Sequence, residues 1–278
     1  MIKMGKKAKN PLSILSGLAN DPLGTIITLL YQLPAILIAL TLHEVSHGYV
    51  AMKCGDPTAQ MLGRLSLNPV KHLDPIGTIC MFLFGFGYAR PVPVNPRNYR
   101  NFRRDDILVS VAGIAMNLCL FLLGSLLMVI VQMFIFDPAL FTETPLTHHD
   151  FLSFNRLYTN LLMQDYQLSI CAEIGLTEFI KNPSLLYIQR FLMFFSLINL
   201  GLAVFNLLPI PPLDGYHLFN DILFRGKLHI PYKVMQGISI VFILLLVFTN
   251  VITNLLSDVR SFLQDGVIRG LLWIFGVQ

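Results

Sequence analysis

Two histidines and a glutamate near residue 45 have the types and spacing of a metal-dependent hydrolase site. They form the sequence His43-Glu44-Val45-Ser46-His47. On a helix, residues four positions apart lie on one face, so His43 and His47 can share a zinc ion while Glu44 acts as general base toward the attacking water. The alternative is a chance match, in which two interfacial histidines flank an exposed glutamate.

A catalytic zinc site usually has three protein ligands, so a third must come from elsewhere in the chain. The strongest candidate is Asp214, which follows prolines at positions 209, 211 and 212. These prolines cannot continue a helix, and we expect the turned backbone to carry Asp214 back along the helix end. A carboxylate beside an apolar span is costly unless it is paired or binds a metal. The alternative is an ordinary Asp-Gly turn at the membrane surface.

Two other histidines are weaker candidates. His217 is close enough to Asp214 in the sequence to be a reserve ligand, and we place it behind the aspartate. His72 could contact a ligand or the substrate, although an interfacial loop residue is the simpler interpretation.

The elements that must position these residues are apolar. The 278-residue chain is 54% hydrophobic and 13% charged, with a mean hydropathy of +0.64, unlike a soluble domain. Residues 22–42, directly before the histidines, contain no charged side chain. Further charge-free runs, each long enough to cross about 30 Å of hydrocarbon as a helix, are Ile107–Phe136, Phe191–Leu213 and Val234–Ser257. The shorter run Pro75–Ala89 contains three glycines and predicts a re-entrant element.

We therefore expect an all-α polytopic membrane protein with about four to six transmembrane helices and a short re-entrant or strand-like element after the first metal-binding helix. Residues 1–278 would form a single membrane-embedded domain. Its expected parts are a metal-binding helix (22–53), a cytoplasmic loop and re-entrant region (54–105), a span (106–136), an exposed acidic insertion (137–184), a span with the third-ligand motif (185–215) and a last long span (234–257).

Composition argues against other classes of function. The four cysteines show no paired spacing, so neither a disulfide framework nor a thiolate zinc site is expected. The net charge of +4 fits loop bias in a membrane protein better than binding to nucleic acid. We find no phosphate-binding glycine loop and no internal repeat of the kind that transporters show.

Three separated segments resemble the motifs of the site-2 protease family of intramembrane zinc metalloproteases. HEVSH resembles the family's HExxH, and Asn206 to Gly215 resembles its Asn-x-x-Pro…Leu-Asp-Gly motif. Between them, Ala112 to Asn117 resembles its Gly-Pro-x-x-Asn motif, except that Ile114 replaces the proline. Residues 55–104 resemble the compact prokaryotic branch, which lacks extra soluble domains.

The resemblance implies a function and roles for named residues. The two histidines and Asp214 would bind one Zn²⁺ per chain, and Glu44 would be the catalytic acid and base. Asn117 and Asn206 would lie near the substrate, where they either donate to the developing oxyanion or join helices by hydrogen bonds. The protein would be an intramembrane zinc endopeptidase that cleaves single-span membrane proteins or signal-peptide remnants in or near their transmembrane segments. The alternative is a non-catalytic membrane protein or transporter that binds helices or metal without proteolysis.

Charge bias predicts the orientation in the cell membrane. Residues 90–104 carry five arginines and no acid, whereas residues 137–184 carry six acids against two basic residues. The positive-inside rule places the arginine loop, and with it the active site, toward the cytoplasm. This arrangement puts the N-terminus outside, against the charge of four N-terminal lysines, unless residues 10–21 lie in the interface or residues 12–33 form a hairpin. The sequence leaves the side of the N-terminus and the oligomeric state open.

Overall fold

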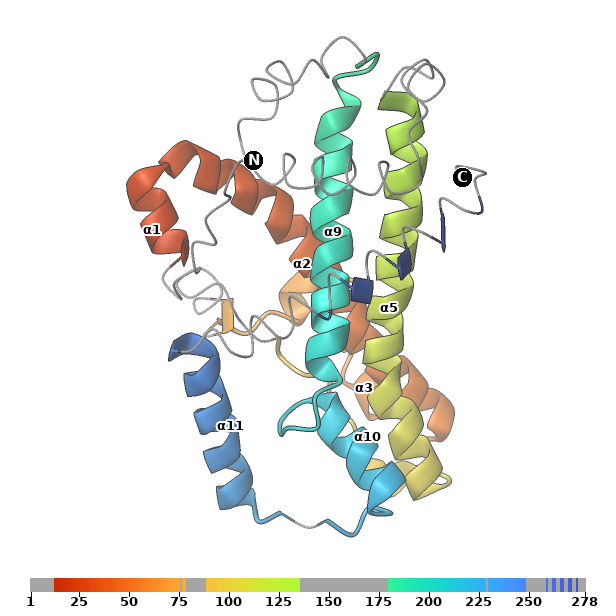
Figure 1. Cartoon of the computed structure of the whole chain (residues 1–278). Helices are drawn as coiled ribbons and strands as arrows, with labels where there is room; N and C mark the ends of the chain where they lie inside the picture. The colour runs from red at the N-terminus through yellow and green to blue at the C-terminus, as the bar shows by residue number, and fades with distance from the viewer. Residues whose placement is uncertain are drawn as a thin grey trace.

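The chain folds as a bundle of helices. The computed structural model describes residues 13–75, 77, 78, 89–135, 180–228 and 230–248, with scattered positions between 259 and 274. Three described helices are long and apolar enough to cross a membrane, namely α2 (Pro22–Cys54), α5 (Phe102–Ile135) and α9 (Leu185–Asn206). This architecture confirms the expected all-α polytopic membrane fold (Figure 1).

The helix α2, which carries His43 and His47, begins at a side-chain cap. The Asp21 carboxylate accepts a hydrogen bond from Gly24 N–H (3.1 Å), and Pro22 takes the first helical position, where no amide donor is needed. The helix ends at Gly55, whose φ of 110° is the left-handed conformation that glycine adopts without strain. A short helix, α1 (Ser13–Asn20), precedes the cap and bends back beside the start of α2.

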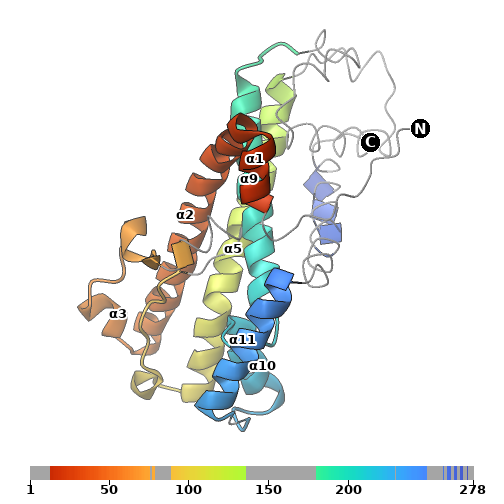
Figure 2. The same cartoon turned by 90° about the vertical axis from the view of Figure 1, so that its left-hand side faces the viewer.

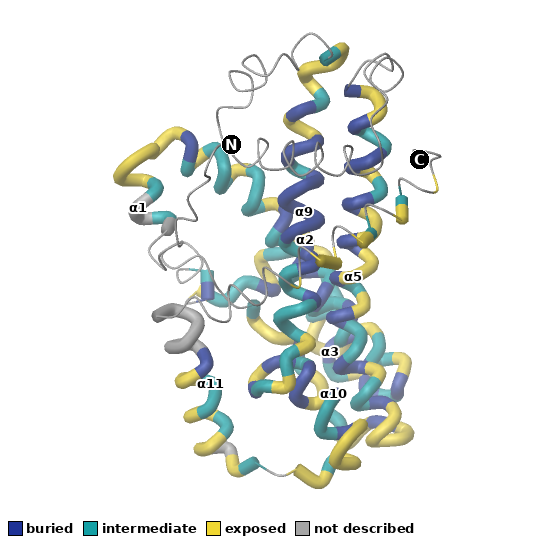
Figure 3. Tube along the Cα trace, viewed as in Figure 1, coloured by how far each residue is buried: buried dark blue, intermediate teal, exposed yellow. Residues whose placement is uncertain are grey.

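The helices α5 and α9 pack antiparallel and form the centre of the bundle (Figure 1). Gly124 on α5 faces Phe195 and Ser196 on α9, and its lack of a side chain lets the helices approach. Ser196 Oγ lies 2.8 Å from Ser125 Oγ and donates to the Phe121 carbonyl (3.0 Å), so these buried hydroxyls are paired. Buried residues, dark blue in Figure 3, follow the facing sides of both helices.

The third long helix, α2, leans against this pair, and its second half lies along the first half of α5 (Figure 2). Small residues on α2 mark the contact, because Ala35, Ala39 and Ala51 are fully buried. His43 is also buried, with 5% of its surface exposed. The metal-competent face of α2 is therefore turned into the protein and away from lipid.

The chain after α2 folds back on the end of that helix as a loop. It contains the short turns α3 (Thr58–Met61), η1 (Pro69–Lys71) and η2 (Pro96–Asn98). Asp56 is fully buried, and its carboxylate accepts hydrogen bonds from Asn95 N–H (2.6 Å) and Asn98 Nδ2 (2.8 Å). Burial would raise the pKa of Asp56, but these bonds and those from Thr58 outweigh it and lower the pKa. An ionised Asp56 thus fastens the loop to the end of α2.

Two expected segments fall mainly outside the described residues. The re-entrant element at Pro75–Ala89 is described only at its edges, where Leu73 and Ala89 form an isolated antiparallel bridge. The part of the chain that the structure describes contains no β-strand. The acidic insertion expected at 137–184 is described only from residue 180 onward.

The proline-rich segment ends α9, as the sequence predicts. The helix stops at Asn206, residues 207–213 are not α-helical, and α10 (Asp214–Leu223) begins directly after them. The helix α10 lies beside the first turns of α5, where Arg103 Nε donates to the Asp221 carbonyl (3.0 Å). Asp214 is thereby carried back toward the bundle.

The last described helix with assigned bounds is α11 (Tyr232–Phe248), which overlaps the first part of the last long span expected at 234–257. It packs on the proline loop through Ser239, whose hydroxyl donates to the Pro211 carbonyl (3.1 Å). The ring of Phe242 contacts that of Phe205 at the end of α9 in a tilted arrangement, with ring centroids 5.7 Å apart. The proline loop is therefore held between α9 and α11.

Candidate metal centre

Three side chains that can bind a metal meet between α2 and the start of α10. His43 and His47 come from successive turns of α2, and Asp214 is the first residue of α10. The two Nε2 atoms lie 3.1 Å apart, and each lies 3.3 Å from Asp214 Oδ2. The structure thus brings together the three residues that the sequence marks as ligand candidates.

The spacing of these three atoms fits a tetrahedral zinc ion. Zinc binds imidazole nitrogen and carboxylate oxygen at about 2.0–2.2 Å, which places neighbouring ligand atoms about 3.3–3.5 Å apart. The observed separations of 3.1 Å and 3.3 Å lie at or just below that range. Among the described residues, no other group of three His, Cys, Asp or Glu side chains has such spacing. Zinc can therefore be accommodated with little movement.

The second nitrogen of each histidine ring has its own partner. His47 Nδ1 lies 2.7 Å from the Val109 carbonyl, which can only accept, so Nδ1 carries the hydrogen and Nε2 keeps a lone pair. His43 Nδ1 lies 3.3 Å from the side-chain nitrogen of Asn117, while the buried Asn117 oxygen lacks a partner. Exchanging the Asn117 oxygen and nitrogen satisfies both residues and leaves His43 Nε2 with a lone pair as well.

With the rings oriented in this way, three lone pairs converge. Two imidazole nitrogens and a carboxylate oxygen repel one another at about 3 Å unless a cation or a proton lies between them. The donor set therefore has the charge and the orientation that a divalent cation requires.

Gly113 on α5 allows the close approach of the two helices at this point. A Cβ atom on Gly113 would overlap His47 Nε2 and the His43 ring. The helix α5 runs unbroken through Gly113 and Ile114, so the buried isoleucine that replaces the family's proline is part of a continuous helix. A larger residue at position 113 would push α5 away from the ligands.

Glu44 and Asn206 lie outside the group of three ligand atoms. Glu44 follows His43 on α2, is half-buried, and accepts a hydrogen bond from Val92 N–H (2.8 Å). Asn206 is the last residue of α9, is half-buried, and has no side-chain hydrogen bond to the described residues. A substrate-binding role for Asn206 stays a prediction, whereas Asn117 contacts a ligand candidate directly.

The structure does not bring the two weaker candidates into the group. His72 is buried inside the loop after α2, where its Nε2 lies 2.7 Å from the Ser66 carbonyl. His217 lies on α10 with its side chain 55% exposed and its Nδ1 4.0 Å from Asp106 Oδ2. Both positions favour structural or surface roles.

Sequence reasoning missed the groups that orient the site residues. The Val109 carbonyl and the Val92 amide act through backbone atoms, whose position depends on how distant segments pack. Only Val92 carries a readable signal, because it supplies the single amide donor between Pro91 and Pro93.

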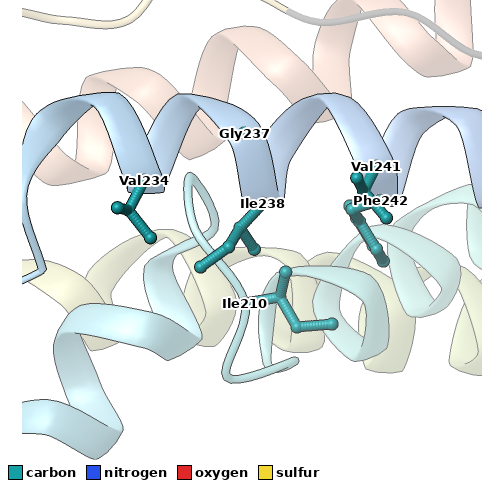
Figure 4. Close-up of a pocket in the computed structure, with 6 residues that line it drawn as sticks. All are labelled: Ile210, Val234, Gly237, Ile238, Val241 and Phe242. Carbon is teal, nitrogen blue, oxygen red and sulfur yellow. The ribbon is translucent and has the colours of Figure 1, made fainter.

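An apolar hollow of about 520 Å³ opens near the proline loop, on the side of α11. Figure 4 shows side chains of α11 directed toward Ile210 in that loop. The hollow is lined by Ile210, Val234, Gly237, Ile238, Val241 and Phe242. Such a lining suits apolar side chains or lipid chains.

Comparisons with known proteins agree on one family. The family model for peptidase family M50 matches residues 31–249. YwhC of Bacillus subtilis (strain 168) is 37% identical over 219 residues, which cover 78% of this chain and 78% of YwhC. Rip2 of Mycolicibacterium smegmatis is 25% identical over 185 residues, which cover 65% of this chain and 52% of Rip2. Both relatives are named "putative zinc metalloprotease". No solved structure matches the chain significantly.

The ligand set predicts the metal content of variants. Wild-type protein should contain about one zinc per chain, and Asp214→Ala should lose most of it because two histidines alone hold zinc weakly. His217→Ala is the matched control on the same helix and should keep its zinc. Elemental analysis of the purified proteins measures both. Full zinc retention in Asp214→Ala would remove the aspartate from the ligand set.

The contact between Asn117 and His43 predicts weaker zinc binding without the amide. Asn117→Ala should lower zinc affinity about 10- to 100-fold, because the His43 ring loses the partner that orients it. Competition with a chromogenic chelator measures the affinity, and Asn206→Ala serves as the control with unchanged affinity. An Asn117→Ala protein that binds zinc normally but cleaves poorly would instead assign Asn117 to the substrate.

Proposed function

The chain belongs to peptidase family M50, a family of zinc metalloproteases, and from this membership we propose that it cleaves peptide bonds in or near the transmembrane segments of other membrane proteins. The observation that carries the proposal is the meeting of His43, His47 and Asp214 beside Glu44, on helices of membrane length. A site of this chemistry between apolar helices is suited to substrates that are themselves in the membrane.

The surroundings of the site support a location within the bilayer. The helix α2, which carries the two histidines, is 33 residues long, and α5, which packs against them, is 34 residues long. Large apolar side chains are exposed on the outside of α5, including Leu118, Leu122, Leu123 and Phe134. An exposed face of this kind is stable against hydrocarbon rather than water.

Each residue of the site has a separate role in peptide hydrolysis. When bound by the two histidines and Asp214, zinc supplies a Lewis acid that polarises the scissile carbonyl and acidifies the attacking water. Glu44 accepts the proton of that water and later donates it to the leaving amine. Asn117 is engaged with a ligand, so Asn206, with no side-chain hydrogen bond to the described residues, is the better candidate to donate to the developing oxyanion.

The proposed substrates are single-span membrane proteins or signal-peptide remnants. Peptide bonds in a helix are shielded by their own hydrogen bonds, so a substrate must unwind before it is cut. The apolar hollow between Ile210 and α11 offers a surface for apolar residues near Asp214 in the chain.

We place the site toward the cytoplasmic face of the cell membrane. Support comes from the arginines of residues 90–104 and from the arrangement of the helices. The end of α2, the start of α5, the end of α9 and α10 all lie at one end of the bundle (Figure 1). The loop with the arginines connects to this same end.

Glu44→Gln should abolish peptide cleavage while leaving the fold and the metal in place. Glutamine is nearly isosteric but cannot accept the proton, and general acid–base assistance is worth about 10²- to 10⁴-fold in rate. The measurement is cleavage of single-span substrates with helix-breaking residues by reconstituted protein, with zinc content as the control. Cleavage at the wild-type rate would rule out this mechanism. If wild type also cleaves nothing yet binds zinc and helices, the non-catalytic alternative becomes the better account.

Sidedness has its own prediction. A single cysteine introduced at Arg97 should react with an impermeant thiol reagent only from the cytoplasmic side, because the arginine loop is expected there. A cysteine at Asp150, in the acidic segment, should react only from outside. Labelling of right-side-out vesicles in a cysteine-free background measures both. The reverse pattern would invert the proposed topology.

A further inference from the structure

The backbone of the segment 89–95 touches the proposed general base. Val92 N–H donates a hydrogen bond to Glu44 Oε2 at 2.8 Å, across 48 positions of sequence. Val92 is buried, with 6% of its surface exposed, so water competes little for this contact. A hydrogen bond between an amide and a carboxylate is among the stronger kinds in proteins.

The local sequence presents only one donor at this point. Val92 lies between Pro91 and Pro93, which have no amide hydrogen. The prolines also restrict the backbone to extended conformations, and residues 91–95 are neither helix nor strand. The segment therefore offers Glu44 a single N–H on a stiff support.

Hydrogen bonds hold the segment on both sides of Val92. On one side, Arg64 Nη2 donates to the carbonyls of Arg90 (2.9 Å) and Pro91 (3.3 Å). On the other, Asn95 N–H donates to the buried carboxylate of Asp56 (2.6 Å), directly after α2. The segment is thus tied to the same helix that carries Glu44.

Packing supports the same placement. A Cβ atom on Gly48, one turn after Glu44 on α2, would meet Leu65 at 2.7 Å and Val92 at 2.8 Å. The absence of a side chain at Gly48 lets the Val92 backbone come within hydrogen-bonding distance of the helix. Three features therefore place the Val92 amide against Glu44. They are the flanking prolines, the hydrogen bonds that involve Arg64 and Asp56, and the missing side chain at Gly48.

We propose that the Val92 amide is a positioning group for Glu44. A carboxylate has two oxygens, and proton transfer needs only one of them. The Val92 N–H occupies Oε2 and fixes the rotamer of Glu44, which leaves Oε1 for the proton of the attacking water. This inference rests on the proposed function, because it assigns Val92 a part in the same reaction.

The experiment removes one hydrogen-bond donor and keeps the side chain. Nonsense suppression with the α-hydroxy acid analogue of valine replaces the N–H at position 92 by an ester oxygen. The matched control places the same ester at Val94, whose N–H makes no hydrogen bond to the described residues. The two ester proteins and wild type are assayed with the same single-span substrate, together with their zinc content.

The ester at position 92 should lower kcat about 10- to 100-fold, as expected for loss of a hydrogen bond to a charged group, with KM and zinc content unchanged. The ester at position 94 should keep kcat near the wild-type value, because it retains the Val92 N–H. In a Glu44→Gln background, the ester at position 92 should have no further effect on the residual rate, because the group that it positions is already disabled.

Other outcomes overturn the proposal in identifiable ways. An unchanged kcat shows that the amide does not position Glu44. A raised kcat shows that the segment is an inhibitory cover, and a raised KM with unchanged kcat shows that it binds substrate. If wild-type protein with full zinc cleaves nothing, the proposed function itself fails and the role of Val92 fails with it. If wild type cleaves and the ester at position 92 does so equally well, only the inference about Val92 fails.

Discussion

The close packing of α5 on α2 at Gly113 is the contact on which the candidate site depends. Because no side chain projects from Gly113, the rings of His43 and His47 fit against α5. This distance brings the Val109 carbonyl and the Asn117 side chain to the outer nitrogens of the two rings. The inner nitrogens are then directed toward Asp214. The packing of α5 on α2 therefore also sets the orientation of the two histidine rings, and with it the geometry of the candidate site.

A second constraint is the cost of polar groups among apolar helices. A buried donor or acceptor destabilises the fold unless it is hydrogen-bonded. In the described spans, Ser125 and Ser196 meet this requirement by pairing with each other. At the metal-competent group, three lone pairs satisfy one another only through a cation or a proton. The proline loop makes this arrangement possible, because it ends α9 and returns the chain so that Asp214 reaches α2. The carboxylate of Asp214 thus lies against two imidazole rings.

The loop after α2 extends this arrangement to the proposed base. Asp56, fully buried at the end of α2, fixes the far part of the loop, and Arg64 fixes its middle. The segment held by Arg64 and Asp56 lies over Glu44. Part of the region expected as a cytoplasmic loop is thus packed on the half of α2 that carries Glu44. These hydrogen bonds match the demand that a general base be held in a defined orientation.

Local and regular features of the site were predictable from the sequence. The histidine pair depends only on helix periodicity, the spans depend on charge-free length, and the end of α9 depends on prolines that cannot continue a helix. These are properties of short stretches of sequence, so they can be predicted without knowing which segments pack against them. The choice of Asp214 as third ligand candidate also followed from its place after the proline run.

The tertiary structure decided what depends on contacts between distant segments. The sequence left Asn117 either near the substrate or in a hydrogen bond between helices. The packing of α5 places it on His43, and the same packing selects the Val109 carbonyl for His47. His72 and His217 have suitable side chains, but the loop and α10 direct them to Ser66 and Asp106. The flanking prolines mark the Val92 amide as a single donor, but only the packing of the loop on α2 shows that Glu44 is its partner. Such orientations depend on how the helices cross and on hydrogen bonds between distant segments, which the order of residues in the sequence does not specify.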